Sequence, residues 1–212
     1  LEEQEQISQI KGWWEQFGTL VTGAAVAAAL ASVGWQGWQW YQGKQSAEAS
    51  ALYGVLQKAA SEKNTQKSRE AAGALIEKYN GTAYADMAAL LSAKVQAEAG
   101  DLKNARVPLA WAATKANDPA LRELARLRLA TVMFDDKAYD EALAQLQAPT
   151  DESLVARFAD LKGDILLAQG KREEARAAYK AVVTALETTT KSESAALREI
   201  AQAKLDAVGG AQ

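Results

Sequence analysis

The sequence contains neither cysteine nor histidine, which removes the commonest means of catalysis and metal binding. Without them the chain has no thiol nucleophile, no imidazole base, no disulfide and no cysteine–histidine zinc site. The glycine-rich phosphate-binding motifs and the nucleophile elbow of hydrolases are missing as well. We therefore expect a protein that is not an enzyme and that holds no cofactor or metal ion.

The sequence also lacks an excess of positive charge. Its formal net charge is -3 and its pI is near 5.2, so it has no overall basic field to attract a phosphate backbone, and we expect no nucleic-acid partner. The acidic pairs Asp135-Asp136 and Glu173-Glu174 fall in or just after predicted turns. Acidic side chains favour helix N-termini, so we interpret these pairs as solvated capping charges and not as catalytic groups.

Proline is scarce, with three residues, and no stretch alternates between apolar and polar residues as a half-buried strand would. Alanine, leucine, glutamate, lysine and glutamine, which favour helices, dominate instead. The sequence therefore predicts an all-α protein with short polar turns. Beyond the N-terminal segment, helices are expected near 46–62, 67–79, 84–99, 102–115, 119–134, 138–147, 152–169, 172–186 and 192–207.

A long uncharged segment runs from Gln16 to Gly43. Its apolar centre, residues 17–35, would span about 28 Å as a helix, which matches the hydrocarbon core of a bilayer. We therefore predict three parts: an N-terminal segment (1–15), a transmembrane helix (16–43) and a helical domain (44–212). Aromatic side chains that favour the membrane interface flank the span, namely Trp13, Trp14, Trp35, Trp38, Trp40 and Tyr41.

Two other interpretations of the uncharged segment are a buried core helix and a cleaved signal peptide ending near Ala29-Leu30-Ala31. The acidic residues before it and the Trp/Gln segment after it argue against cleavage. Lys11 on one side balances Lys44 on the other, so the positive-inside rule gives no orientation. A stripe of small residues, which arises easily by chance in an alanine-rich helix, would suit packing against another membrane helix: Thr19, Gly23, Ala27 and Ala31.

A repeat is visible in the C-terminal part of the chain. The turns in AEAGDLKNARVPL, MFDDKAYDEALAQL and LAQGKREEARAAY superpose, each followed by an alanine, and their spacing brackets the roughly 34-residue tetratricopeptide period. In the clearest copy, Gly163 precedes Ala175 and Tyr179 follows it. Small residues let paired helices approach, and stacked pairs leave a concave surface. The pattern predicts a tetratricopeptide-like solenoid of helical hairpins; a non-repetitive alanine-rich bundle is the alternative. The aligned alanines are Ala105, Ala142 and Ala175.

The same alignment predicts which side chains line the concave surface. Apolar members would hold partner or client segments, and charged members would set their orientation. The alternative is that Leu124 and Leu127 belong to the core and that the alignment is shifted by one or two positions. The predicted protein-binding groove comprises Met87, Leu90, Lys94, Leu124, Leu127, Thr131, Arg157, Asp160 and Asp164.

The order of these features resembles one family. The features are an acidic start, the segment Ile10-Lys11-Gly12-Trp13-Trp14 with Gly18 shortly after it, a small-residue span, an exit marked by Gly34-Trp35, Trp38 and Trp40, and repeats from about Ser46. Together they resemble the YfgM family, whose members are ancillary subunits of the SecYEG translocon in Gram-negative bacteria. The span is richer in alanine than is typical of that family.

The resemblance implies a single-pass inner-membrane protein with a cytoplasmic N-terminus and a periplasmic tetratricopeptide-like domain. It also implies contact with membrane lipid, association with SecYEG and with the chaperone PpiD, and a chaperone-like role toward unfolded secretory proteins. Two other functions stay open. A membrane-anchored adaptor for cell-envelope assembly would share the repeats, whereas an enzyme would need a perturbed cluster of carboxylates or lysines in a pocket.

Overall fold

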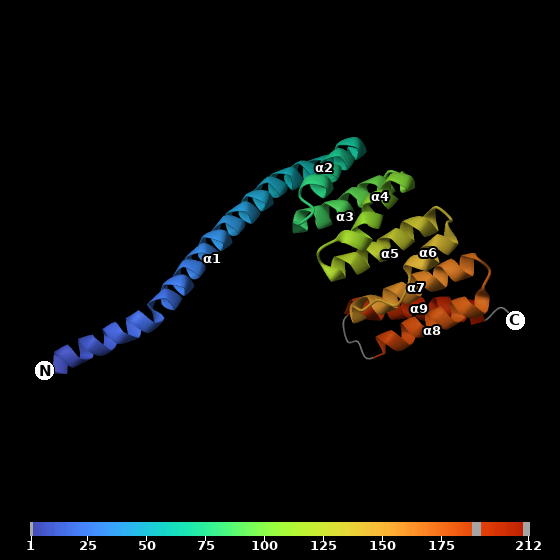
Figure 1. Ribbon diagram of the computed structural model, residues 1–212. Coiled ribbons are helices and arrows are strands. Elements are labelled where there is room, and N and C mark those ends of the chain that lie inside the picture. The colour runs from blue at the N-terminus through green and yellow to red at the C-terminus, as the bar shows by residue number, and fades with distance from the viewer. Residues whose placement is uncertain (1, 188–191, 210–212) are drawn as a thin grey trace. The chain divides into compact units, whose positions relative to one another are not determined.

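The computed structural model describes residues 2–187 and 192–209, and within these ranges it contains helices and no strand, which confirms the all-α prediction. The helices follow one another through short connections (Figure 1). They are α1 (Glu2–Ser61), α2 (Thr65–Lys78), α3 (Ala83–Glu98), α4 (Leu102–Lys115), α5 (Pro119–Asp135), α6 (Tyr139–Gln145), α7 (Glu152–Ala168), α8 (Arg172–Leu186) and α9 (Ser192–Gly209).

Helix α1 contains the predicted membrane span. Among the described residues it is the one helix long and apolar enough to cross a membrane, with a mean hydropathy of 1.7 in its most apolar window. Only 6% of that window is buried, and large side chains such as Leu20, Leu30 and Val33 are exposed. A core helix of a soluble domain shows the opposite burial, so the structure supports a membrane span over the alternative of a buried core helix.

The contacts within the chain divide it into two units, Leu1–Ala47 and Glu48–Gln212. Helix α1 continues across this division, whereas the sequence predicted a separate helix near 46–62. Residues 43–46, where the predicted span ends and the next predicted helix begins, include no proline. Gly43 costs a helix only about 1 kcal/mol. That cost alone does not end a helix.

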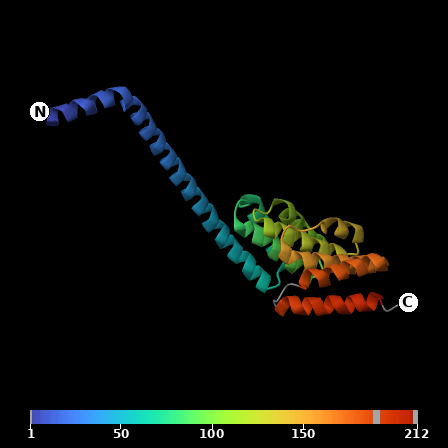
Figure 2. The same ribbon diagram turned by 90° about the horizontal axis from the view of Figure 1, so that it is seen from below.

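The second unit is a stack of helical hairpins. The end of α1 pairs with α2 around Leu56 and Leu75, and α3–α4, α5–α6 and α7–α8 follow in order (Figure 1). Helix α9 packs against α8 at the edge of the stack (Figure 2). The three aligned alanines lie in α4, α6 and α8, and all are fully buried. This burial confirms the predicted repeat register.

The turns within the repeated hairpins share one geometry. Gly100 and Gly170 adopt positive φ angles of 80° and 78°, and the N–H of the residue after each bonds back to the preceding helix. In the turn between α5 and α6, Lys137 occupies the same place with a φ of 60°. A side chain in this conformation is strained, so the middle repeat uses a less favourable residue than its two neighbours do.

Candidate functional site

The nine predicted groove residues lie on the first helices of three consecutive hairpins, three each on α3, α5 and α7. All nine line two adjoining pockets of about 570 Å³ and about 290 Å³. The larger pocket lies mainly between α3 and α5, and the smaller one between α5 and α7. Leu124, Arg128 and Thr131 line both pockets. We call the two pockets together the groove.

The apolar part of the groove is formed by side chains at different depths. Leu127 is only 8% exposed and belongs to the core cluster around Phe158 and Ile165, so it is chiefly a core residue, as the alternative interpretation held. Met87, Leu90 and Leu124 are half-buried and open onto the larger pocket. This graded burial leaves an apolar floor that a ligand side chain can reach without displacing the core.

Sequence reasoning missed several residues that line the groove. Tyr53 reaches it from the end of α1, and its ring lies 5.7 Å from that of Tyr84. Arg128 was missed although it follows Leu124 by one helical turn, a spacing that places both on one face. Asp135 and Glu98 also line the larger pocket. The groove therefore carries more charge than the predicted set implied.

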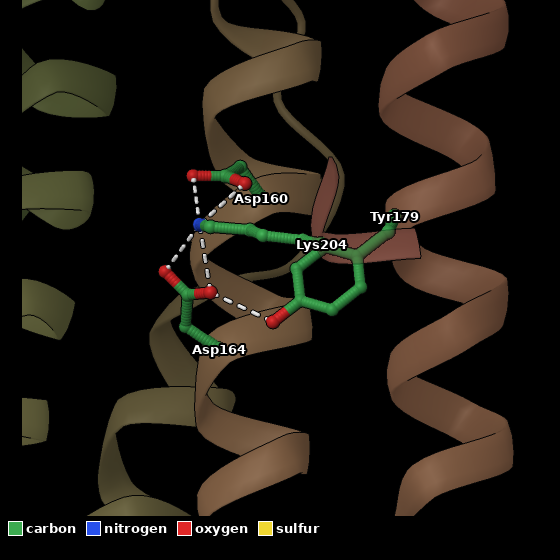
Figure 3. Close-up of polar contacts among 4 residues, drawn as sticks. All are labelled: Asp160, Asp164, Tyr179 and Lys204. Carbon is green, nitrogen blue, oxygen red and sulfur yellow. Dashed lines mark hydrogen bonds and ion pairs between the residues drawn. The ribbon is translucent and has the colours of Figure 1, made fainter. Parts of the chain in front are cut away.

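Two predicted groove carboxylates, Asp160 and Asp164, are bound by Lys204 of α9 (Figure 3). The Lys204 Nζ lies 2.8 and 3.0 Å from the two oxygens of Asp160 and 2.8 Å from Asp164. The Tyr179 hydroxyl donates to Asp164 at 2.7 Å, and the ammonium lies 5.4 Å from the Tyr179 ring centroid. These carboxylates hold α9 against α7, whereas the sequence had suggested that they orient a ligand.

This network shifts two pKa values in the same direction. Burial disfavours the charged ammonium, but the hydrogen bonds and charges of Asp160 and Asp164 outweigh it, so the pKa of Lys204 is raised. Burial, followed by the hydrogen bond to Asp164, raises the pKa of the Tyr179 phenol. Both groups therefore keep their protons to higher pH in the folded protein.

Buried acids join neighbouring hairpins near the groove. Glu123 of α5 accepts hydrogen bonds from the Thr150 N–H at 2.8 Å, the Thr150 hydroxyl at 2.6 Å and the Asp151 N–H at 3.0 Å. These bonds, the one from the Thr150 hydroxyl first, lower the pKa of Glu123. Asp86 of α3 likewise accepts the Asn117 N–H at 2.9 Å. Each acid fixes the loop that leads into the next hairpin.

The predicted membrane-interface aromatics are all exposed on α1. Trp35 and Trp38 lie with ring centroids 5.4 Å apart, and the Lys44 ammonium lies 5.8 Å from the Trp40 ring centroid. Trp13, Trp14 and Tyr41 are exposed in the same way. The tryptophans on either side of the span thus present large amphipathic surfaces, which suits the headgroup region of a bilayer.

The small-residue stripe of α1 is exposed along its length at Thr19, Gly23, Ala27 and Ala31. The indole of Trp14 lies over Gly18, where an added Cβ would come within 3.1 Å of the indole nitrogen. These small residues are therefore accessible on the surface of α1. Their packing against another membrane helix stays a prediction. Among the described residues no group of three or more acidic side chains is placed to hold a metal ion.

The chain is similar to a family of repeat-like domains and to several proteins that share one name. A family model described as a tetratricopeptide repeat-like domain matches residues 11–210. The chain is 33% identical to the ancillary SecYEG translocon subunit of Haemophilus influenzae, over 85% of this chain and 88% of that one. It is 28% identical to the protein of the same name from Neisseria gonorrhoeae, over 98% of both. The chain therefore belongs to the YfgM family of ancillary SecYEG translocon subunits, built on a tetratricopeptide repeat-like domain.

Proposed function

We propose that the chain is a membrane-anchored ancillary subunit of the SecYEG translocon that offers its groove as a protein-binding module. The likeness to the named relatives, which extends over nearly the whole of both chains, carries this proposal. The apolar helix α1 supplies the anchor, and the stack of hairpins supplies a rigid binding surface. This role needs no catalytic group, and we propose that the protein is not an enzyme.

The proposed topology places residues 1–15 in the cytoplasm and the helical domain in the periplasm. The absence of cysteine makes this directly testable, because a single introduced thiol is the only one to react. A membrane-impermeant maleimide should label Lys103→Cys in intact spheroplasts, and Glu5→Cys only after lysis. The reverse pattern would contradict the topology.

The proposed partners at the groove are PpiD and unfolded secretory proteins, toward which the protein would act as a chaperone. Half-buried Met87, Leu90 and Leu124 support this role, because flexible thioether and aliphatic side chains adapt to varied apolar segments. The charged rim of Lys94, Glu98 and Arg128 would add selectivity.

The test uses the full chain in detergent. The wild-type protein should capture SecYEG and PpiD. Met87→Ser with Leu90→Ser should weaken capture of PpiD in a protein that stays folded, with a modest fall in melting temperature because Leu90 also packs against the core. The matched control is Val107→Ser, which removes an exposed apolar side chain of α4 that lines neither pocket.

Failure to capture SecYEG, with outer-membrane assembly factors recovered in its place, would favour the envelope-assembly adaptor. Loss of stability before loss of binding would show that Met87 and Leu90 serve the core.

A further inference from the structure

The groove carries one basic side chain from each of three successive hairpins: Lys94 on α3, Arg128 on α5 and Arg157 on α7. Lys94 lies 3.7 Å from Glu98 of its own helix. Within the described ranges, neither Arg128 nor Arg157 has an acidic side chain within 4.0 Å. Both line the smaller pocket, where their side chains are exposed and form no ion pair with a carboxylate of the protein.

The acids of the smaller pocket are already engaged. Asp160 and Asp164 line it, but both are bound by Lys204 of α9 at 2.8 Å (Figure 3). Counting that ammonium with the two aspartates and the two arginines leaves one positive charge over at this end of the groove. A negatively charged ligand group would balance it without disturbing Lys204.

Asp135, a groove acid for which no ion pair is found among the described residues, lies outside this pocket. Asp135 lines the larger pocket, and it follows Arg128 along α5 by about 10 Å of helix. The larger pocket also holds the Lys94–Glu98 pair, and its apolar side chains include Met87, Leu90 and Leu124. The groove thus has most of its apolar side chains between α3 and α5, and an excess of one positive charge between α5 and α7.

We propose that the groove selects peptide segments in which apolar side chains are followed by a carboxylate. The apolar side chains occupy the larger pocket, and the carboxylate pairs with Arg128 and Arg157 in the smaller one. Guanidinium groups suit this task because they bind a carboxylate in a planar, bidentate way. Leu124 and Leu127 line the same pocket and offer apolar surface beside the two guanidinium groups.

This inference rests on the proposed protein-binding role of the groove, and the experiment separates the two. Short synthetic peptides of apolar sequence are arrayed in three versions that differ at one residue: Asp, Asn or Lys. The full chain in detergent is applied, and retention is measured at low and high salt. We expect wild type to bind the Asp version about tenfold better than the Asn version, and the preference to shrink in high salt.

Three variants define the outcome. Arg128→Gln with Arg157→Gln should bind Asp and Asn versions equally and keep the wild-type affinity for the Asn version. Lys103→Gln removes an exposed charge of α4 outside both pockets and should keep the preference. Met87→Ser with Leu90→Ser should lose binding of all versions.

Two results would overturn the inference. Equal binding of the Asp and Asn versions by wild type, or a preference for Lys, removes acid selection and leaves the binding groove intact. No binding of any version by wild type removes both the selection and the groove function.

Discussion

The ring of Tyr179 in α8 lies directly against the backbone of Gly163 in α7. A Cβ added at Gly163 would come within 2.9 Å of the Tyr179 Cζ, closer than real Cβ contacts come. Tyr179 is fully buried, and its hydroxyl is held by Asp164, so the ring has little freedom to move aside. The glycine is therefore a requirement of the hairpin.

Gly163→Ala should destabilise the protein by about 1–3 kcal/mol through overpacking against Tyr179. Gly73→Ala is the matched control, because Gly73 is also helical but has nothing within 4 Å of an added Cβ. It should stabilise by about 0.5–1 kcal/mol through helix propensity. Urea unfolding of both variants measures the difference. Equal effects at the two positions would contradict the contact.

Lys137→Gly should stabilise the protein by about 1 kcal/mol, because its φ of 60° is strained for any side chain. Lys103→Gly provides the control, since Lys103 lies within helix α4. There a glycine should cost about 1 kcal/mol. Chemical denaturation of both variants should give shifts of opposite sign, and a loss of stability at Lys137 would show that its side chain makes a compensating contact.

The protein should lose stability in alkaline solution through Lys204 and Tyr179. Both have pKa values raised above their ordinary 10.5 and 10.0 in the folded state. A group whose pKa is raised by folding stabilises the folded state fully at pH values below its ordinary pKa. This stabilisation is lost as the pH rises through the pKa that the group has in the folded state. Stability should therefore begin to fall near pH 10.0.

Lys204→Met separates the two groups. The variant should be less stable than wild type below pH 10, and its stability should fall less steeply above that pH. Lys180→Met, at an exposed position of α8, serves as a control for loss of a charge. Parallel pH profiles for wild type and Lys204→Met would contradict the role of Lys204.

Glu123→Gln should destabilise the protein by about 1–3 kcal/mol, because the buried carboxylate accepts three hydrogen bonds from the loop before α7. The pKa of Glu123 is lowered from 4.5, so its stabilisation is present above that pH and is lost as pH falls through the folded value. At neutral pH the variant should therefore have a lower free energy of unfolding than wild type, and this free energy should change less as the pH is lowered. Glu152→Gln, at an exposed position, is the control.

The sequence predicted the repeat register and nine of the residues that line the two pockets, because both depend on local spacing, and binding of protein there stays a prediction. Small residues at fixed intervals determine which helix faces meet, so Ala105, Ala142 and Ala175 were placed correctly. The unbroken passage of α1 into the helical domain was missed, because the end of an uncharged span marks a change of environment and does not by itself end a helix. Lys204 was also missed. Its partners lie some forty residues away on α7, and no local pattern links them.

The hydrogen bonds from Glu123 and Asp86 restrict how a repeat array like this one can be shortened or extended in evolution. Each acid belongs to one hairpin, and it accepts hydrogen bonds from backbone N–H groups in the loop just before the next hairpin. Deleting the downstream hairpin would strand a desolvated carboxylate, which costs more than the lost contacts alone. A hairpin followed by nothing would thus need a different residue at that position, so loss or gain of a unit requires a second, compensating substitution upstream.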